Sequence, residues 1–510
     1  MIDLTKNEET IQQNAKHCKS HNIKLPTFRQ MQNPETIDDE IKDELKNVSL
    51  WESHPANLFR INWKNEPTAK GGGFGGVNYL VIPPEISGVK SKIIALVGKW
   101  FPTGAHKVGA TYGCLAPALI SGQFSPEETK AVWPSTGNYC RGGAYVSSLL
   151  GCDSIAILPE NMSRERFEWL KKVAGEIIAT PGCESNVKEI FDKCWELKNT
   201  RNDIQIFNQF EEFGNPLWHY MVTGKAAEEA LQKEMGANSR FAGAISSSGS
   251  AGSMAFGYYL KDKFPGSKLA VAEALQCPTL LNNGFGDHRI EGIGDKHVPW
   301  IHDCKNTDMI IGVDDEVTIR LLRLFNESLG RDCLVDYGID SEFVNQLDRL
   351  GISCIGNMIA AIKFSKYYEL TEDDYVVTIL TDSMELYGSR IEELAIERGE
   401  YLSDDEQEHV SLPSPDKRPA AGSPEARSMR DFDKEAEDAL KSIKYDLSPR
   451  SKKRCEAEAQ SFRSAARPDD ERLYVMRHRA AFHDMLLLVG RVNAYRQRLE
   501  DLKGRDLGVL

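Results

Sequence analysis

Short apolar runs alternate with longer segments of helical periodicity between about residues 90 and 390. The runs that predict strands are Ile93–Val97, Ala131–Trp133, Ser154–Leu158, Glu176–Ala179, Ile204–Phe207, Phe241–Ile245, Leu269–Ala272, Met309–Val313 and Tyr375–Leu380. Most precede a helical pattern, such as Glu165–Val173, Trp218–Lys233, Val317–Leu329 or Ile359–Leu370. Strands separated by helices of this length predict βαβ units and a parallel sheet. So many strands fit an α/β fold of two lobes better than one sheet.

The flanking segments have a different composition. Residues 1 to about 50 are polar, with one candidate helix at Asp38–Lys46, and predict an arm or a peripheral lobe. A stretch rich in Pro, Ser, Asp and Glu, residues 401–427, predicts a disordered linker. Val475–Leu502 predicts a helix that packs on a partner or on the core. We therefore expect an N-terminal arm and peripheral segment (1–84), a region of two α/β lobes (85–398), a linker (399–430) and a charged helical tail (431–510).

Net charge and cysteine content limit the classes of protein to which this chain can belong. The formal net charge of −14 argues against nucleic acid or an anionic membrane surface as a partner. Eleven cysteines without a Cys-x-x-Cys pair indicate reduced thiols. The first residues are polar, and no apolar run approaches the roughly 18 residues of a membrane span. We therefore expect a cytoplasmic protein.

The first candidate for chemistry is Lys107. The turn Thr103–His106 lies between the strand Ile93–Val97 and a helix predicted at Val108–Leu119, and Lys107 stands where that helix begins. Open α/β folds bind ligands at such turns, at the carboxyl edge of the sheet. Partial enclosure disfavours an ammonium ion and lowers the pKa of a lysine, which frees the amine for imine chemistry. The alternative is a solvated lysine in the first turn of a helix.

Two other turns also join a strand to a helix. Ser135–Asn138 precedes a helix predicted from about Gly142, and its hydroxyls, amide and backbone N–H groups could hold a carboxylate. A helix N-cap explains the same residues equally well. Ser246–Ser253 consists of small residues that let the backbone wrap around an anion. It lacks the dinucleotide pattern, so a lone phosphate fits better than a pyrophosphate. Its position between a strand and a helix favours phosphate binding over the alternative, a flexible Ser/Gly loop.

Ser353 and a group of histidines complete the candidates. The Ser353 hydroxyl precedes an apolar helix, where it could contact a heteroaromatic nitrogen or simply cap the helix. His288, His297 and His302 lie near Asp295 and Asp303, but without a metal-binding spacing, so no metal site is predicted.

Together these turns resemble the pyridoxal-phosphate enzymes of fold type II, the group of cysteine synthase, cystathionine β-synthase and the tryptophan synthase β chain. Thr103–Lys107 resembles the Schiff-base lysine motif of the tryptophan synthase β chain. Ser135–Asn138 resembles the asparagine loop of the group, and Gly249–Ser253 resembles its phosphate loop.

Further segments resemble cysteine synthase in the same order along the chain, over roughly residues 85 to 390. They are Glu160–Arg166 with Ala179–Gly182, Asn208–Pro216 with His219 and Thr223–Gly224, His288–Gly294, Gly351–Ser353 and Leu380–Ser383. Whole stretches also resemble a bacterial branch of pyridoxal-phosphate-dependent β-subunit-like proteins, although the tail after about residue 400 does not. His106, Ala251 and Tyr139-Cys140 depart from the cysteine synthase pattern.

The resemblance implies a fold with pyridoxal 5′-phosphate in the cleft between two lobes. Lys107 would hold the cofactor as a Schiff base and, once freed, would take the Cα proton. The implied cofactor-binding residues are Lys107, Asn138, Gly249, Ser250, Ala251, Gly252, Ser253 and Ser353. The implied substrate-binding residues are Ser135, Thr136, Gly137, Asn138, Gln209 and His106.

The implied reaction is β-elimination or β-replacement on a small amino acid, of the serine, O-acetylserine or cysteine type, through an aminoacrylate. A neutral Ser353 beside the pyridine nitrogen favours this course over transamination. One alternative is a dehydratase or desulfhydrase that releases a keto acid and ammonia. Another is a partner-dependent β-subunit-like protein with little activity alone. A dinucleotide-dependent oxidoreductase shares the α/β pattern but lacks the fingerprint. The expected assembly is a homodimer.

Overall fold

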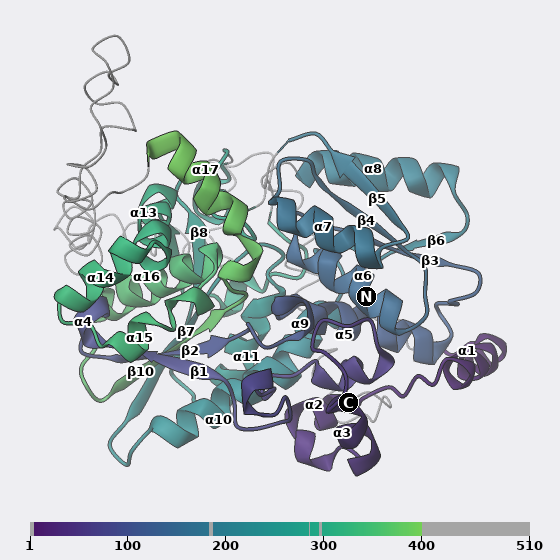
Figure 1. Ribbon diagram of the computed structural model, residues 1–510, viewed down its shortest axis with the longest axis horizontal. Coiled ribbons are helices and arrows are strands. Elements are labelled where there is room, and N and C mark those ends of the chain that lie inside the picture. The colour runs from purple at the N-terminus through teal and green to yellow at the C-terminus, as the bar shows by residue number, and fades with distance from the viewer. Residues whose placement is uncertain (1–4, 183–186, 285, 295–297, 400–510) are drawn as a thin grey trace, which may run out of the picture.

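Two sheets of mostly parallel strands lie side by side in the computed structural model (Figure 1). The structure describes residues 5–182, 187–284, 286–294 and 298–399. The prediction of two α/β lobes is therefore confirmed. The linker and the tail helix predicted after residue 400 lie outside the described residues.

The larger sheet has six strands in the order β1-β2-β10-β7-β8-β9. Its strands are β1 (Tyr79–Ile82), β2 (Lys92–Val97), β7 (Arg240–Ser247), β8 (Lys268–Ala274), β9 (Met309–Val313) and β10 (Asp374–Leu380). All neighbours pair in parallel except β1, which runs antiparallel to β2 at the edge. The sequence analysis missed β1, because four residues followed by two prolines give too short a pattern.

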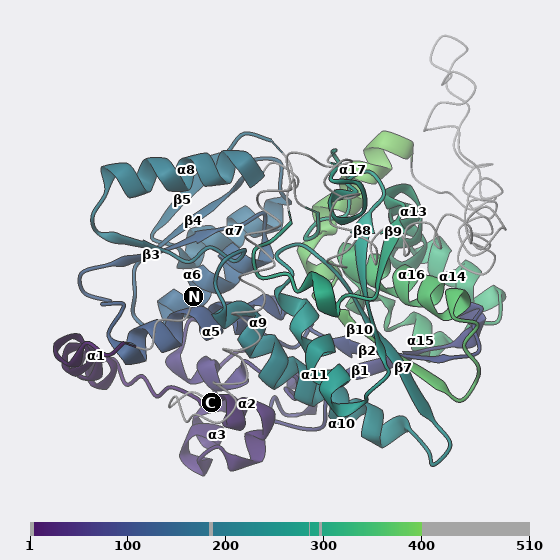
Figure 2. The same cartoon turned by 180° about the vertical axis from the view of Figure 1, so that it is seen from behind.

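The smaller sheet has four parallel strands in the order β5-β4-β3-β6. These are β3 (Lys130–Pro134), β4 (Ser154–Pro159), β5 (Glu176–Thr180) and β6 (Ile204–Ile206). Figure 2 shows both sheets from behind, with α8 (Val187–Thr200) over the smaller one and α10 (Gly224–Glu234) and α11 (Ala255–Lys263) beside the larger. Each apolar strand predicted from the sequence therefore forms a strand of one of the two sheets.

Helices link the strands, and several begin earlier than their sequence patterns suggest. The remaining helices of the two lobes are α4 (Pro84–Ser87), α5 (Lys107–Ser121), α6 (Asn138–Leu149), α7 (Arg164–Val173), α9 (Gly214–Trp218), α12 (Thr279–Asn282), α13 (Asp315–Asn326), α14 (Ser328–Asp336), α15 (Ser341–Val344), α16 (Ile352–Tyr367) and α17 (Gly388–Arg398). The helical pattern predicted over Trp218–Lys233 is confirmed, and within it a π-helical segment at His219–Thr223 joins α9 to α10.

The predicted start of α6 at about Gly142 was wrong, because the helix begins at Asn138. The glycines within this helix are needed for packing. A Cβ atom on Gly143 would lie 2.0 Å from the Trp133 ring on β3. Tertiary contact thus overrides the low helix propensity of glycine, and it places Asn138 in the first turn of a helix.

The N-terminal segment packs with its first helix against α5 and with its second against the π-helical segment at His219–Thr223. Its helices are α1 (Glu8–Ser20), α2 (Phe28–Gln32) and α3 (Asp39–Leu45). Asn14 donates hydrogen bonds to the carbonyls of Leu119 and Phe124, both at 2.8 Å. His17 bonds the Leu150 carbonyl at 2.8 Å. Polar side chains of the arm thus satisfy backbone groups at the ends of α5 and α6.

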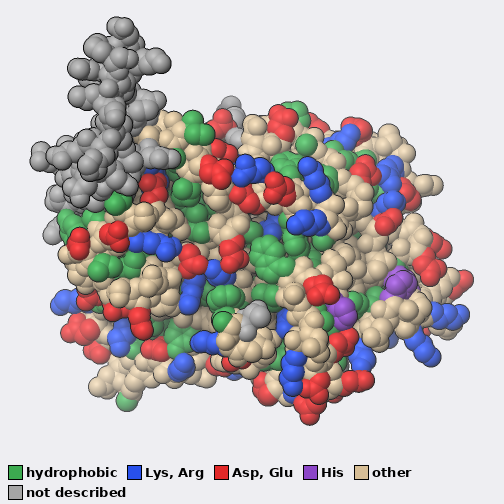
Figure 3. Space-filling view, viewed as in Figure 1, with side chains coloured by type: hydrophobic (Ala, Val, Ile, Leu, Met, Phe, Trp, Pro, Cys, Tyr) green, Lys and Arg blue, Asp and Glu red, His purple; other side chains and the backbone are tan. Residues whose placement is uncertain are grey.

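The carboxyl ends of β2, β3, β7 and β10 lead into the loops between the two lobes. Ligands of open α/β sheets bind at such edges. On the face seen in Figure 3, acidic and basic side chains are interspersed. Among the described residues, no helix has the length and apolar character to cross a membrane.

Candidate active site

A cavity between the two lobes brings together residues that are far apart in sequence. Its lining consists of His106, Lys107, Ser135–Tyr139, Gln209, Phe210, Ser247, Gly249, Ser250, Ser253, Gly292–Gly294, Ser353, Asn357 and Thr381. Every predicted site residue lines this cavity except Ala251 and Gly252 of the phosphate loop. The three turns and Ser353 were predicted separately, and the fold places them around one cavity.

Lys107 is the first residue of α5 and is half-buried in the cavity wall. Its Nζ atom donates a hydrogen bond to Ser250 Oγ at 3.2 Å. The candidate nucleophilic amine therefore lies directly beside the loop that we predicted to hold a phosphate. This contact joins the turn after β2 to the turn after β7.

A pair of buried histidines stands behind Lys107. The ring centroids of His106 and His219 are 5.0 Å apart. His106 Nδ1 lies 3.1 Å from the Thr381 carbonyl, which can only accept, so Nδ1 carries the proton. Its buried Nε2 atom has no hydrogen-bond partner among the described residues. Sequence reasoning gave His219 no role, because only the fold brings it to His106.

Both imidazoles are held neutral. Burial lowers the pKa of His106 to about 3, and the charge of Lys107 acts in the same direction. Burial also lowers the pKa of His219 well below its usual value, with His106 and Lys107 contributing. Neutral rings next to a lysine avoid a repulsive cluster of positive charge.

We expect His106→Asn to reduce the loss of stability in acid. The unfolded His106 binds a proton below about pH 6.5, whereas the folded residue does not, so acid favours unfolding. Between about pH 7.5 and 5 this linkage costs roughly 2 kcal/mol, and asparagine, which keeps a donor for the Thr381 carbonyl, removes it. Denaturant titrations of the cofactor-free protein at both pH values measure the difference. The exposed His21, changed to Asn, is the control. An unchanged pH dependence in His106→Asn would contradict the expectation.

The turn after β3 provides neutral donors for a carboxylate. Ser135 Oγ accepts hydrogen bonds from the Gly137 N–H at 3.1 Å and from Gln209 Nε2 at 3.2 Å. The fold thus brings Gln209 to the loop with which we predicted it to act. Gly137 must be glycine, since a Cβ atom there would lie 2.6 Å from Arg166 Nη1.

The predicted phosphate loop is tightly enclosed. Asn215 Nδ2 donates to Ser250 Oγ at 3.1 Å. A Cβ atom on Gly252 would lie 2.0 Å from Asn215 Oδ1, so only glycine fits there. Ala251 has φ of +63°, a left-handed conformation that costs a residue with a Cβ atom about 1 kcal/mol. The loop is thus built around a strained turn.

Ala251→Gly is therefore expected to stabilise the protein by about 1 kcal/mol, because glycine adopts this conformation without strain. The free energy of unfolding measures the gain. Ala255→Gly in α11, where φ is −63°, serves as the matched control and is expected to destabilise. Equal effects at the two positions would show that the left-handed backbone of Ala251 carries no strain.

Ser353 has a partner that sequence reasoning did not consider. Its hydroxyl lies 2.9 Å from Thr381 Oγ1, immediately after β10. Thr381 also lines the cavity. The signal was present, since the segment Leu380–Ser383 resembles one of the cysteine synthase family and follows a buried strand. We gave it no role, because nothing in the sequence places it beside Ser353.

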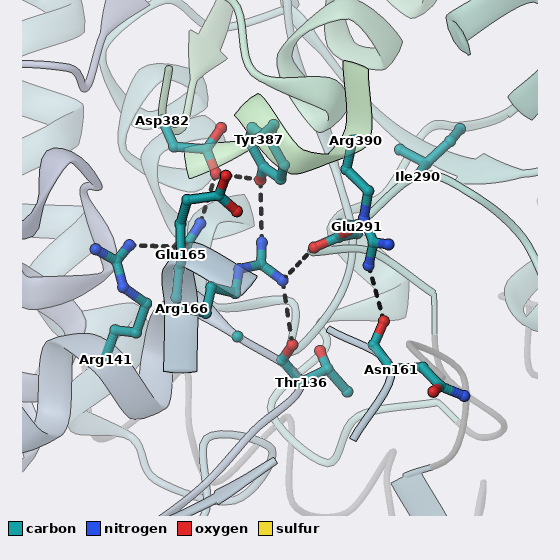
Figure 4. A network of polar contacts seen from close by, with 12 residues as sticks. Thr136, Arg141, Asn161, Glu165, Arg166, Ile290, Glu291, Asp382, Tyr387 and Arg390 are labelled. Carbon is teal, nitrogen blue, oxygen red and sulfur yellow. Dashed lines mark hydrogen bonds and ion pairs between the residues drawn. The ribbon is translucent and has the colours of Figure 1, made fainter. Parts of the chain in front are cut away.

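A network of buried charged groups spans the two lobes behind the Ser135–Asn138 turn (Figure 4). Arg166 of α7 is fully buried, forms an ion pair with Glu291 at 2.6 Å and donates to the Tyr387 hydroxyl at 3.1 Å. Arg390 contacts Glu291 and the Asn161 carbonyl. Figure 4 shows Asp382 and Tyr387 pointing toward one another at one end of this network.

The Asp382 carboxylate lies fully buried at that end. It accepts hydrogen bonds from the Tyr387 hydroxyl and from Asn138 Nδ2, both at 2.6 Å. Burial raises the pKa of Asp382, while the Tyr387 hydrogen bond and the charge of Arg166 act to lower it. The donors thus partly offset the cost of burying a carboxylate.

The cavity residues fit pyridoxal 5′-phosphate. Hydroxyl and backbone N–H groups of the loop 249–253 suit a phosphate, and glycine is obligatory where a Cβ atom would fill the space. Ser353 offers an uncharged hydroxyl, Asn138 an amide and Lys107 an amine in the same cavity. The unpartnered Nε2 of His106 is a further buried polar atom at this wall. Among the described residues, no cluster of His, Cys, Asp and Glu could hold a metal ion.

Comparison with known proteins identifies the class. The family described as pyridoxal-phosphate dependent enzyme matches residues 100–334, which form a domain of this family. The cofactor of the family is pyridoxal 5′-phosphate, and the solved structures similar to this chain have fold type II, as the sequence analysis predicted.

The relatives include a cystathionine beta-synthase, a cysteine synthase and a hydrogen sulfide-producing enzyme. Cystathionine beta-synthase of Saccharomyces cerevisiae is 26% identical over 313 residues, 60% of this chain and 58% of that protein. Cysteine synthase of Staphylococcus aureus is 28% identical over 289 residues, 56% of this chain and 84% of that protein. A hydrogen sulfide-producing enzyme of Fusobacterium nucleatum has a TM-score of 0.51 at 24% identity, over 61% of this chain and 95% of that one. The chain thus spans little more than half of the yeast relative.

Proposed function

We propose that this protein is a pyridoxal-phosphate-dependent enzyme that catalyses β-replacement on a small amino acid of the serine, O-acetylserine or cysteine type. One observation carries the proposal. The Lys107 amine lies 3.2 Å from Ser250 of the predicted phosphate loop, in a cavity that Asn138 and Ser353 also line. The similarity to cysteine synthase and cystathionine beta-synthase supports it.

Each residue of the cavity has a task in this reaction. When bound, the pyridoxal ring supplies an electron sink for the bond that breaks at Cα. The neutral Lys107 Nζ takes the Cα proton, and Ser250 Oγ accepts a hydrogen bond from the ammonium group that results. Ser353 would donate to the ring nitrogen without adding a charge, and Asn138 would donate to the ring oxygen. Both residues would thus hold the ring in the cavity.

The amino acid binds on the smaller lobe. Gln209, Ser135 and the N–H groups at the start of α6 hold its carboxylate, because they gather neutral donors at one wall. Neutral His106 faces the same cavity and adds no positive charge. Enclosure between the two lobes excludes water, which favours transfer to a thiol over hydrolysis.

The enzyme purified with pyridoxal 5′-phosphate is expected to be yellow, and borohydride should fix the cofactor mass to Lys107. It is then incubated with serine, O-acetylserine, cysteine and threonine, each with and without sulfide or a thiol, and thioether, cysteine, keto acid and ammonia are measured. Thiol-dependent product supports β-replacement. Keto acid and ammonia as the main products would establish a dehydratase or desulfhydrase instead.

Two other outcomes bear on the proposal. A colourless protein that takes up no cofactor would contradict it. Bound cofactor without turnover of any of these amino acids would favour the partner-dependent alternative, in which the chain acts only with another subunit.

We extend the proposal to the domain boundaries, the cellular location and the oligomeric state of the protein. We assign the catalytic region to residues 85–398 and expect a cytoplasmic homodimer. The described cysteines all have free thiols, which supports a reducing compartment. Light scattering of the purified protein measures the assembly.

A further inference from the structure

The fold gives the Asn138 amide two side-chain hydrogen-bond partners, one that accepts and one that donates. Its Nδ2 atom donates to Asp382 Oδ2 at 2.6 Å, and its Oδ1 atom accepts from Arg141 Nη1 at 3.4 Å. A carboxylate can only accept and a guanidinium can only donate. The two partners therefore select the same orientation of the amide.

This orientation determines what Asn138 presents to the cavity. The amide has two N–H groups, and Asp382 uses one of them. The second N–H remains on the same nitrogen, and Asn138 lines the cavity. With the amide turned over, an oxygen atom would take its place, and an oxygen would repel the anionic ring oxygen of pyridoxal phosphate.

Asp382 and Asn138 belong to different lobes. Asp382 follows β10 of the larger sheet, whereas Asn138 begins α6, which follows β3 of the smaller one. Asp382 is itself fixed, because its backbone bridges to Ala105 and its carboxylate accepts from Tyr387. A Cβ atom on Gly351 would lie 2.0 Å from Asp382 Oδ1, so the carboxylate has little room to move. The larger lobe thus holds an amide of the smaller one.

We propose that Asp382 is a positioning residue, which turns the Asn138 amide so that an N–H group faces the cofactor ring oxygen when the two lobes are in contact. The inference rests on the proposed function, since it concerns the same cofactor. It gives Asp382 a role that acts through Asn138 and not through contact with the substrate.

The test is a double-mutant cycle on the holoprotein, with Asp382→Ala, Asn138→Ala and the double variant. Two properties are measured, namely the ratio of the long- to the short-wavelength cofactor absorption bands, which follows ionisation of the ring oxygen, and the dissociation constant of pyridoxal 5′-phosphate. We expect each single variant to lose long-wavelength absorption and to bind the cofactor roughly tenfold more weakly. We expect the double variant to match Asn138→Ala, because Asp382 acts only through that amide.

Three variants separate positioning from general damage. Asp382→Asn keeps an acceptor of the same reach and is expected to stay within about twofold of the wild type in affinity, with its absorption bands unchanged. Ser389→Ala removes another contact between the lobes, the 2.7 Å hydrogen bond to Glu165, without touching Asn138, and should leave the bands unchanged. Should the alanine variant not fold, Asp382→Ser, whose hydroxyl is too short to reach Nδ2, takes its place in the cycle.

The outcomes distinguish the inference from the proposed function. Wild-type protein that takes up no cofactor contradicts the proposed function. A yellow wild type with identical bands and affinity in Asp382→Ala contradicts the positioning role alone. Additive losses in the double variant also overturn it, because Asp382 would then act independently of Asn138.

Discussion

Replacement of Lys107 by alanine should lower kcat by at least about 10²- to 10⁴-fold, the range that a positioned general base contributes. In the function that we propose, the substitution also removes the amine to which the cofactor becomes attached. The phosphate loop and Ser353 remain, so the cofactor is expected to bind without a covalent link. Turnover, cofactor affinity and the mass after borohydride reduction measure the three effects.

Lys99 provides the matched control for this experiment. It lies in the same segment after β2 and forms ion pairs with Asp348 at 2.5 Å and Glu385 at 3.1 Å outside the cavity. Lys99→Ala is expected to keep both the borohydride label and the turnover. A Lys107→Ala protein that is still labelled at another lysine, or is still active, would show that the amine has been assigned to the wrong residue.

Arg166→Ala is expected to lower the free energy of unfolding by about 3–5 kcal/mol, because it removes one of the two arginines that pair with the buried Glu291 carboxylate and leaves only Arg390. It also removes the donor to Tyr387 that helps to hold the network between the lobes. Denaturant unfolding of the cofactor-free protein measures the loss.

Arg164 is a control on the same helix and between the same two lobes. Its ion pair with Glu392 is exposed, with side chains 60% and 64% accessible, so Arg164→Ala is expected to change stability by less than about 1 kcal/mol. Similar losses of unfolding free energy in the two variants would contradict the expectation that the buried Arg166 pair contributes more to stability than an exposed pair.

The sequence predicted the strands of both sheets because buried parallel strands form apolar runs bounded by turns. It also predicted the turns that carry Lys107, Asn138 and Ser250, because each follows such a run. Polar residues directly after an apolar strand were enough to identify these turns, and no knowledge of which residues lie close together in space was needed.

Contacts across the chain could not be predicted in this way. Asp382 meets Asn138 over a separation of 244 residues, and His106 meets His219 only because α5 packs against α9. The start of α6 depends on the Trp133 ring, which no local propensity reveals. Sequence patterns therefore identified the residues at the cavity wall better than the residues that support them.

The strand order has a consequence for synthesis of the protein. β10 lies between β2 and β7, although it is the last to be made of the ten strands in the described residues, and its seven residues are all buried. Until the ribosome has added it, the facing edges of β2 and β7 have no partner, and such open edges invite aggregation. A nascent chain or a truncation that stops before Asp374 should therefore depend on a chaperone, however well the smaller lobe has folded by then.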